Sequence, residues 1–269
     1  MKKLALVTAI SLILTACGSG GGSSSADNTK PEKIEGVLFA YDFLHPVEKE
    51  SKDPAGNIIT YDDYEIKTTR FSKDDDINHI LINNVSIPLN PNGDEKYTAY
   101  YQGVGDDAVE VGQVLTSIVS DKTYKHMRFG QHSTYDYDPN YHESHLKDQL
   151  TFGMFVQGYV TENMPTSGTV TYKGDAYGGL EALTKGKSKL DVDFGHKTLK
   201  GTLSDWQNYD FLAEKDKLQT ISFDASIEGN KFEGKNVKGS FFGRNADEIG
   251  GIYHDEIRRE GAVFGAKKQ

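Results

Sequence analysis

Side chains that can bind haem iron or a metal ion are concentrated in residues 135–145, which read YDYDPNYHESH. Three tyrosines, three acidic residues and two histidines fall within this stretch. Imidazole and phenolate groups are axial ligands of haem iron, and aromatic side chains can form the slot that holds a porphyrin. We therefore interpret the stretch and the strand before it as a candidate haem site. Its candidate ligand-binding residues are His126, His132, Tyr137, Tyr141, His142 and His145.

The residues on either side fit the same interpretation. Phe129 and Phe152 lie on the strands expected to flank the stretch, where they would extend its apolar surface. A neighbouring cation, Arg128 or Lys125, could pair with a haem propionate. The sequence thus offers axial ligands for iron, aromatic rings that could pack against a porphyrin, and a cation for a propionate, all within a short segment.

Two other interpretations of this stretch remain open. It could be an exposed hairpin tip without a ligand, because polar loops that contain histidine often have none. It could instead bind zinc, with His142 and His145 joined by Asp136, Asp138 or Glu143. The metalloprotease motif H-E-x-x-H is absent, since a single residue separates Glu143 from the second histidine.

The elements that must position these residues are two strands, predicted at residues 123–132 and 150–160. They leave a connection of residues 133–149 between them. Connections longer than about 12–15 residues are uncommon in compact domains and are usually functional or disordered. Because disordered segments are poor in aromatic residues, we predict a functional loop.

Short segments rich in β-branched and aromatic residues predict a mainly β protein. In the N-terminal half we expect strands at 36–43, 58–68, 79–88, 97–102, 109–119, 123–132 and 150–160, with a short helix as an alternative at 109–120. In the C-terminal half we expect eight strands, at 168–177, 181–183, 188–194, 198–203, 220–227, 231–239, 249–254 and 261–265. Their spacing predicts an eight-stranded antiparallel up-and-down β-barrel, which leaves no exposed edge. One short helical turn, capped by Asn245, is expected at 245–248.

The first residues predict the compartment. Lys2 and Lys3 precede an apolar run that is too short to span a bilayer, which is typical of a secretory signal peptide. The signal ends before Cys17, the only cysteine, as in bacterial lipoproteins. We predict a signal peptide at 1–16, a lipid-modified Cys17 carrying palmitate, and a flexible tether at 17–33. The protein would then contact the membrane only through its lipid anchor.

Charge and motifs exclude several classes of function. The precursor has 30 basic and 40 acidic residues, so removal of Lys2 and Lys3 leaves 28 − 40 = −12. Nucleic acids and anionic lipid surfaces are poor partners for such a chain. Residues 184–188 imitate the end of a P-loop, but Glu181 stands where its first glycine is required. No nucleophile elbow is present, and we expect a binding protein and no enzyme.

Four stretches of the C-terminal half carry a family resemblance. They are PTSGTVTYKGDAYG at 165–178, VDFGHKTLKG at 192–201, GSFFGRNADEIGG at 239–251 and VFGAK at 263–267. Together they resemble the C-terminal eight-stranded barrel of the transferrin-binding-protein-B-like surface lipoproteins of Gram-negative bacteria. This group includes factor H binding protein, a haemoglobin-binding lipoprotein and the hemophilins.

The resemblance implies an N-terminal handle or ligand-binding domain at 34–164 and a β-barrel at 165–269. It also implies display at the surface of the outer membrane through a Slam-type translocator. The expected function is the binding of haem or of a haem-carrying host protein for iron acquisition, and the expected partner is haem or a host haem or iron protein. The alternative is a non-enzymatic binder of a complement regulator, transferrin or a host-tissue receptor, serving immune evasion or colonisation. We expect a monomer.

Overall fold

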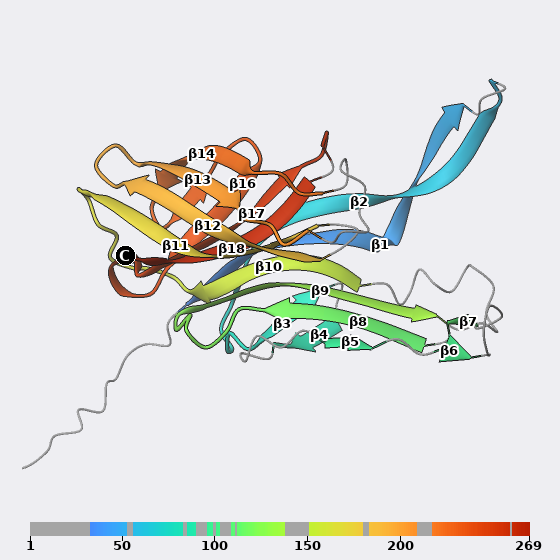
Figure 1. Cartoon of the computed structure of the whole chain (residues 1–269), viewed down its shortest axis with the longest axis horizontal. Coiled ribbons are helices and arrows are strands. Elements are labelled where there is room, and N and C mark those ends of the chain that lie inside the picture. Colours follow the sequence, from blue (N-terminus) through green and yellow to red (C-terminus); the bar gives the residue numbers. More distant parts are fainter. Residues whose placement is uncertain are drawn as a thin grey trace, which may run out of the picture. The chain divides into compact units, whose positions relative to one another are not determined.

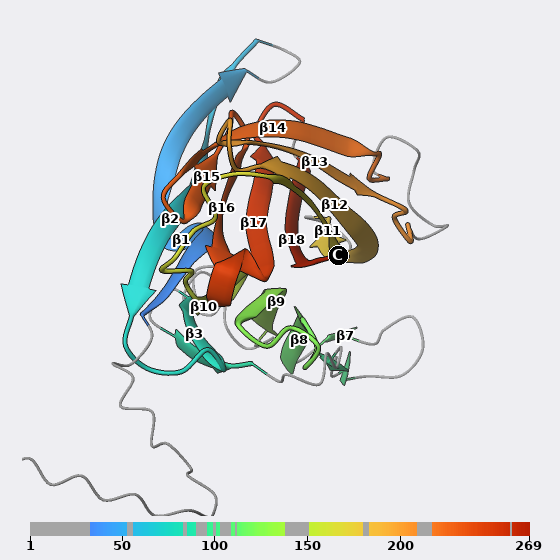
Figure 2. The same ribbon diagram turned by 90° about the vertical axis from the view of Figure 1, so that its left-hand side faces the viewer.

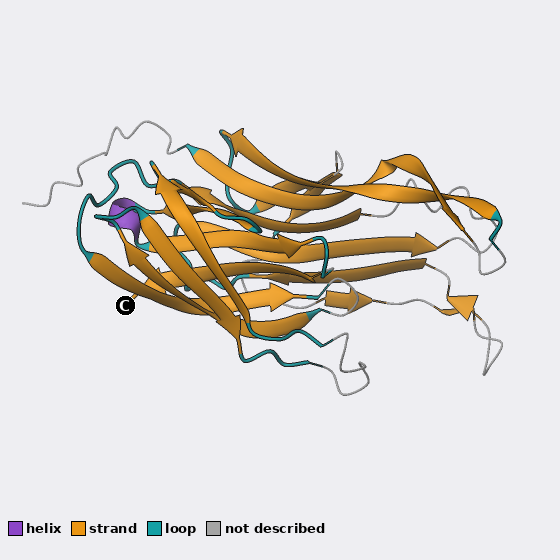
Figure 3. Cartoon of the chain, turned by 90° about the horizontal axis from the view of Figure 1, so that it is seen from above, coloured by secondary structure: helices purple, strands orange, loops and turns teal. Residues whose placement is uncertain are grey.

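The described part of the chain is built almost entirely of strands (Figures 1 and 3). The computed structural model describes residues 33–52, 56–82, 85–89, 96–98, 101–102, 109–110, 112–137, 151–179, 183–208, 217–258 and 260–269. The expected mainly β fold is confirmed. Among the described residues, no helix has the length and apolar character that a membrane crossing requires.

Six strands of the N-terminal half form one sheet in the order β2-β1-β10-β9-β8-β5. Their bounds are β1 Ile34–Lys52, β2 Ile58–Lys73, β5 Lys96–Thr98, β8 Gly112–Val119, β9 Met127–Tyr137 and β10 Thr151–Tyr159. Two small hairpins accompany it, β3 His79–Ile82 with β4 Val85–Pro88, and β6 Tyr101–Gln102 with β7 Val109–Glu110. The helix considered at 109–120 is therefore wrong, because β8 is held between β5 and β9.

β9 is buried on both faces of the sheet, because its successive side chains point alternately to the barrel and to the β3–β4 hairpin. Phe129 lies on the face that packs against the barrel, whereas the neighbouring Gly130 lies under the ring of Phe155 on the opposite face. That opposite face is covered by an apolar cluster that includes Ile80 and Ile82 of β3. A strand buried on both sides has no solvent-facing alternation, and most residues from Met127 to His132 are accordingly apolar or uncharged.

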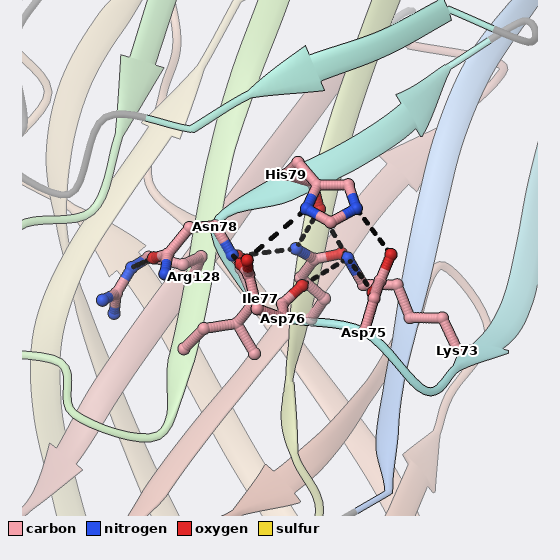
Figure 4. Close-up of polar contacts among 8 residues, drawn as sticks. Lys73, Asp75, Asp76, Ile77, Asn78, His79 and Arg128 are labelled. Atoms are coloured by element: carbon pink, nitrogen blue, oxygen red, sulfur yellow. Dashed lines mark hydrogen bonds and ion pairs between the residues drawn. The ribbon is translucent and has the colours of Figure 1, made fainter.

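The turn before β3 is fixed to the sheet by polar contacts (Figure 4). The ammonium of Lys73 pairs with Asp75 at 3.0 Å and donates to the carbonyl of His79 at 2.6 Å. His79 Nε2 lies 2.5 Å from Asp75 Oδ2. The amide of Gln157 in β10 donates to the same His79 carbonyl at 2.8 Å. These contacts hold the β3–β4 hairpin over the sheet.

The C-terminal half is a closed barrel of eight antiparallel strands (Figure 2). The strands are β11 Thr169–Gly178, β12 Thr184–Asp193, β13 Thr198–Ser204, β14 Ile221–Glu228, β15 Lys231–Glu233, β16 Val237–Phe242, β17 Glu248–Asp255 and β18 Glu260–Lys268. The predicted eight-stranded barrel is confirmed, although one detail differs. The segment expected as one strand at 231–239 is split into β15 and β16 by a turn at Gly234. Of the strand expected at 181–183, residues 181 and 182 lie outside the described residues.

The barrel interior follows from alternation in β12, β13 and β14, whereas β17 and β18 are buried on consecutive positions. In β12, Leu190 and Val192 are buried, while Lys187 and Lys189 face solvent and pair with acidic neighbours. Tyr172 lies inside the barrel, where its hydroxyl donates to the carbonyl of Ala246 at 2.6 Å. The buried hydroxyl of Tyr172 therefore has its hydrogen-bond partner within the protein.

The predicted helical turn is a 3-10 helix at Arg244–Ala246. Asn245 does not cap it, since its side chain makes no capping hydrogen bond and its backbone is left-handed, with φ 54°. Asparagine adopts this conformation more readily than most residues. The role of Asn245 is therefore to turn the chain between β16 and β17.

Candidate binding surface

The direction of the strands decides which connections lie close together. β1 starts beside the barrel, where the carbonyl of Lys33 accepts the Val160 N–H at 3.3 Å and Val160 pairs with Phe242. β9 starts at the same end, since a Cβ added to Gly243 would meet the ring of His126 at 2.5 Å. β1 and β9 therefore finish at the opposite end, from which β2 and β10 return. We call this opposite end the loop end.

Of the candidate residues that the sequence singled out, only Tyr137, the last residue of β9, is described at the loop end. β9 continues to Tyr137, because residues 112–119 of β8 pair with it throughout. The strand therefore ends at Tyr137, five positions beyond the predicted end at residue 132, and β10 starts at Thr151. Tyr141, His142 and His145 lie outside the described residues, as do the candidate zinc ligands Asp138 and Glu143. Of Tyr137 only the backbone is described.

The two described histidines of the candidate set are not brought together. His126 precedes β9, and its backbone N–H donates to Glu248 of the barrel at 3.0 Å. His132 lies six positions further on, which corresponds to roughly 20 Å along an extended chain. One iron ion could not bind both imidazoles.

His132 is buried in the sheet, with 5% of its surface exposed. It pairs with Gly153 of β10 and Ser117 of β8, on the face that the β3–β4 hairpin covers. Its Nδ1 atom is buried and has no hydrogen-bond partner. Burial lowers the pKa of His132 to about 4, so the imidazole is neutral at physiological pH. A neutral imidazole with an unused nitrogen is the form that binds metals.

The residues expected to flank a porphyrin have structural roles. Phe129 stacks on Tyr177 of β11, with ring centroids 5.3 Å apart, and Phe152 packs edge-on against Phe39 at 6.3 Å. The guanidinium of Arg128 donates to the carbonyls of Tyr124 and Met127 at 2.6 and 2.7 Å. Arg128 is thus engaged within the sheet, and both phenylalanines belong to the core between sheet and barrel.

A buried carboxylate that the sequence did not predict links the barrel to the segment before β9. Glu248 Oε1 and Oε2 accept the backbone N–H groups of Lys125 and His126, at 2.7 and 3.0 Å. Burial raises the pKa of Glu248, while the two N–H groups act in the opposite direction. No local pattern marks this residue, because its partners lie more than 120 positions away.

A second tie joins the edge of the sheet to the barrel. The guanidinium of Arg70 in β2 donates to the carbonyls of Phe232 and Gly239, at 3.0 and 3.1 Å. These two residues pair across β15 and β16, so Arg70 spans the seam between the strands. Burial lowers the pKa of Arg70, and Glu233 at 3.8 Å compensates in part. The adjoining hollow of about 520 Å³ is lined by residues of β14 and β15 with their turn.

The described surface of the loop end is apolar in places. Ile58 and Ile59 of β2 are 64% and 47% exposed, and Ile257 in the β17–β18 turn is 91% exposed. The carboxylate of Asp255 accepts the N–H groups of Ile257 and Arg258, which fixes this turn. Exposed isoleucines on ordered backbone are suited to fill pockets of a protein partner. Among the described residues, no group of three or more His, Cys, Asp or Glu could hold a metal ion.

Residues 164–268 match the family model described as the C-lobe and N-lobe beta barrels of Tf-binding protein B. An uncharacterized protein of Haemophilus influenzae is 26% identical over 310 residues, which cover 100% of this chain and 99% of that protein. Transferrin-binding protein B of Haemophilus influenzae is 25% identical over 304 residues, which cover 89% of this chain and 46% of the relative. The chain therefore spans about half the length of that relative.

Among solved structures, the isotype 1 transferrin binding protein B of serogroup B Neisseria meningitidis aligns with 88% of this chain and 43% of its own. The TM-score is 0.49 and the sequence identity 20%. The family resemblance read from residues 165–267 is confirmed by the family match and by the similarity to the Haemophilus relative.

Proposed function

Because its barrel is of the transferrin-binding-protein-B type, we propose that this protein binds a host iron-carrying protein at its loop end. The observation that carries the proposal is the family match over residues 164–268, extended by similarity to a transferrin-binding protein over 89% of the chain. We propose a role in iron acquisition, as a binding protein and not an enzyme.

The fold supports this function physically. The barrel is closed, so it presents no strand edge for unspecific pairing. The sheet shares a core with the barrel, which holds the loop end on a rigid base. Exposed isoleucines at that end can supply the apolar centre of an interface.

The test uses protein that begins at residue 18, so that it is soluble without lipid. Iron-loaded transferrin, iron-loaded lactoferrin and haemoglobin are immobilised, and binding is measured by interferometry. We expect saturable binding to one of the three, with serum albumin as the control protein. Absence of saturable binding to all three would contradict the proposal.

Haem itself is a second candidate ligand, favoured by one observation. His132 is buried, neutral and unpartnered at Nδ1, which suits an axial ligand. Because only 5% of its surface is exposed, haem binding requires displacement of the side chains that cover it. The remaining candidate ligands, Tyr137, Tyr141, His142 and His145, stay predictions.

Haem binding is tested by adding haemin and recording the Soret band. His132→Ala should abolish the shifted band, whereas His126→Ala, whose ring lies at the other end of the sheet, should keep it. An unshifted spectrum of the unmodified protein would remove haem as a direct ligand. It would leave the binding of an iron-carrying protein untouched.

We propose lipid anchoring at Cys17 and display on the outer membrane, following the sequence interpretation. Replacement by Cys17→Ala should release the protein from the membrane fraction. Whole cells that express the unmodified chain should be labelled by an antibody to the barrel. Labelling only after permeabilisation would contradict surface display.

A further inference from the structure

One strand pair continues far beyond the sheet. β1 pairs with β10 only from Ile34 to Ala40, but with β2 from Ile34 to Lys52. Beyond Ala40, β1 and β2 therefore form a two-stranded ribbon, residues 41–52 and 58–66, at the loop end (Figure 1). The register shifts between Asp42 and Pro46 at the base of this ribbon. We call residues 41–52 and 58–66 the β1–β2 ribbon.

Near the ribbon tip, side chains that the structure describes are exposed on both faces. Ile58 and Ile59 are consecutive in β2, so their side chains point to opposite faces. Both are exposed, by 64% and 47%. Opposite Ile58 in β1 lies Lys52, whose side chain is also exposed. Isolated two-stranded hairpins are only marginally stable in water. A partner that covers the exposed isoleucines would stabilise the ribbon.

The charge of the ribbon indicates the kind of partner. It contains two lysines, Lys49 and Lys52, against six acidic residues. The acidic residues are Asp42, Glu48, Glu50, Asp62, Asp63 and Glu65. A basic surface complements this charge. A second copy of the chain does not, because it carries the same ribbon and the same formal net charge of −10.

We propose that the β1–β2 ribbon is the element that docks onto the host iron-carrying protein, against a basic surface with apolar pockets for Ile58 and Ile59. This inference rests on the proposed function and names the part of the loop end that recognises the partner. Because Ile58 and Ile59 lie on opposite faces of the ribbon, each enters its own apolar pocket where the partner surrounds the tip, and both are desolvated in the interface. The acidic residues steer the encounter and set its salt dependence.

The first test replaces the apolar tip. The double variant Ile58→Ser/Ile59→Ser is compared with Leu81→Ser, whose side chain on β3 is 56% exposed. Binding is measured to whichever of iron-loaded transferrin, iron-loaded lactoferrin and haemoglobin the unmodified protein binds. We expect the dissociation constant to rise at least about tenfold for the double variant and to stay within about twofold for the control. Equal affinities for the two variants would overturn the proposal.

The second test removes the ribbon. Asp42 and Glu65 are directly paired, so an Asn-Gly turn can join them in place of residues 43–64. The strand segments that pair with β10 are retained, and thermal unfolding should remain cooperative at a similar temperature. Binding should be lost. A shortened protein that is folded and binds normally would overturn the proposal.

The third test addresses charge. Glu48→Gln/Glu50→Gln changes two exposed ribbon residues, while Asp224→Asn/Glu228→Gln changes two exposed residues of β14 as the control. Association of the ribbon variant should slow at low salt and depend less on ionic strength. An unchanged salt dependence would contradict recognition by charge.

The outcomes separate this inference from the proposed function. If the unmodified protein binds none of the three probes, the function fails, and the ribbon proposal fails with it. If the unmodified protein and the shortened protein bind alike, only the ribbon proposal is overturned. If the unmodified protein is a dimer by light scattering and the shortened one a monomer, the occupant is a second copy, which also overturns it.

Discussion

The carboxylate of Glu248 in the barrel accepts the backbone N–H of Lys125, with Oε1 and N 2.7 Å apart, across the interface between barrel and sheet. A second oxygen accepts the N–H of His126. Replacement by Glu248→Ala leaves both donors without this partner, and we expect the free energy of unfolding to fall by about 2–3 kcal/mol. Urea unfolding measures the change. Glu228→Ala, an exposed change in β14, is the control and should leave the midpoint unaltered.

The packing between sheet and barrel depends on a glycine in the last barrel strand. A Cβ added to Gly265 would lie 2.2 Å from the ring of Phe129. Gly265→Ala should therefore push the ring of Phe129 off Tyr177 and lower the free energy of unfolding by roughly 1–3 kcal/mol. Gly195→Ala in an open turn meets only Asp193, at 3.3 Å, and serves as the control in the same thermal unfolding experiment. Equal melting temperatures for both variants would show that the two layers do not pack as described.

The seam between β15 and β16 depends on Arg70. Arg70→Met keeps much of the side-chain volume but removes both donors to the carbonyls of Phe232 and Gly239. We expect a loss of about 1–3 kcal/mol in unfolding free energy, together with faster amide exchange in β15 and β16. The free energy of unfolding of Arg70→Lys should lie between those of the unmodified protein and Arg70→Met. An ammonium keeps the charge but lacks the planar fork that reaches both carbonyls. Unchanged exchange in these strands would contradict the bridging role.

Acid should weaken the fold through His132. Burial lowers its pKa from 6.5 to about 4, so between these values the unfolded chain binds more protons than the folded one. The contribution of neutral His132 is complete above pH 6.5 and is lost as the pH falls towards 4, by on the order of 3 kcal/mol. His132→Leu should flatten the decline in stability over this window, measured by urea unfolding at successive pH values. An identical slope for variant and unmodified protein would show that His132 does not titrate in this way.

Local pattern was sufficient for the barrel strands. The sequence LDVDF at 190–194 alternates without interruption, and the structure buries Leu190 and Val192 while exposing Asp191. The division of residues 231–239 into β15 and β16 escaped prediction, because the turn at Gly234 follows only three residues of strand. Such a short strand shows too few alternations to be recognised.

The sheet and the candidate site were less predictable, since long-range pairing determines both. β9 continues through Tyr137 because β8 pairs with it, although the residues 133–137 are polar and were expected to form a loop. The sequence grouped His126 with His132, but the strand places them roughly 20 Å apart. Glu248 and Arg70 carry no local pattern, because their partners are distant in sequence. The functional assignment of residues 138–150 stays a prediction.

The barrel closes through β18, which pairs with β17 on one side and with β11, the first barrel strand, on the other. Without β18, β11 would lack its second neighbour, and Phe129 of the sheet would lack the Gly265 backbone against which it packs. One strand therefore completes both the barrel and its interface with the sheet. Because β11 and β18 are the first and last strands of the barrel, both depend on pairing between segments that are distant in sequence, which is a slow step in folding.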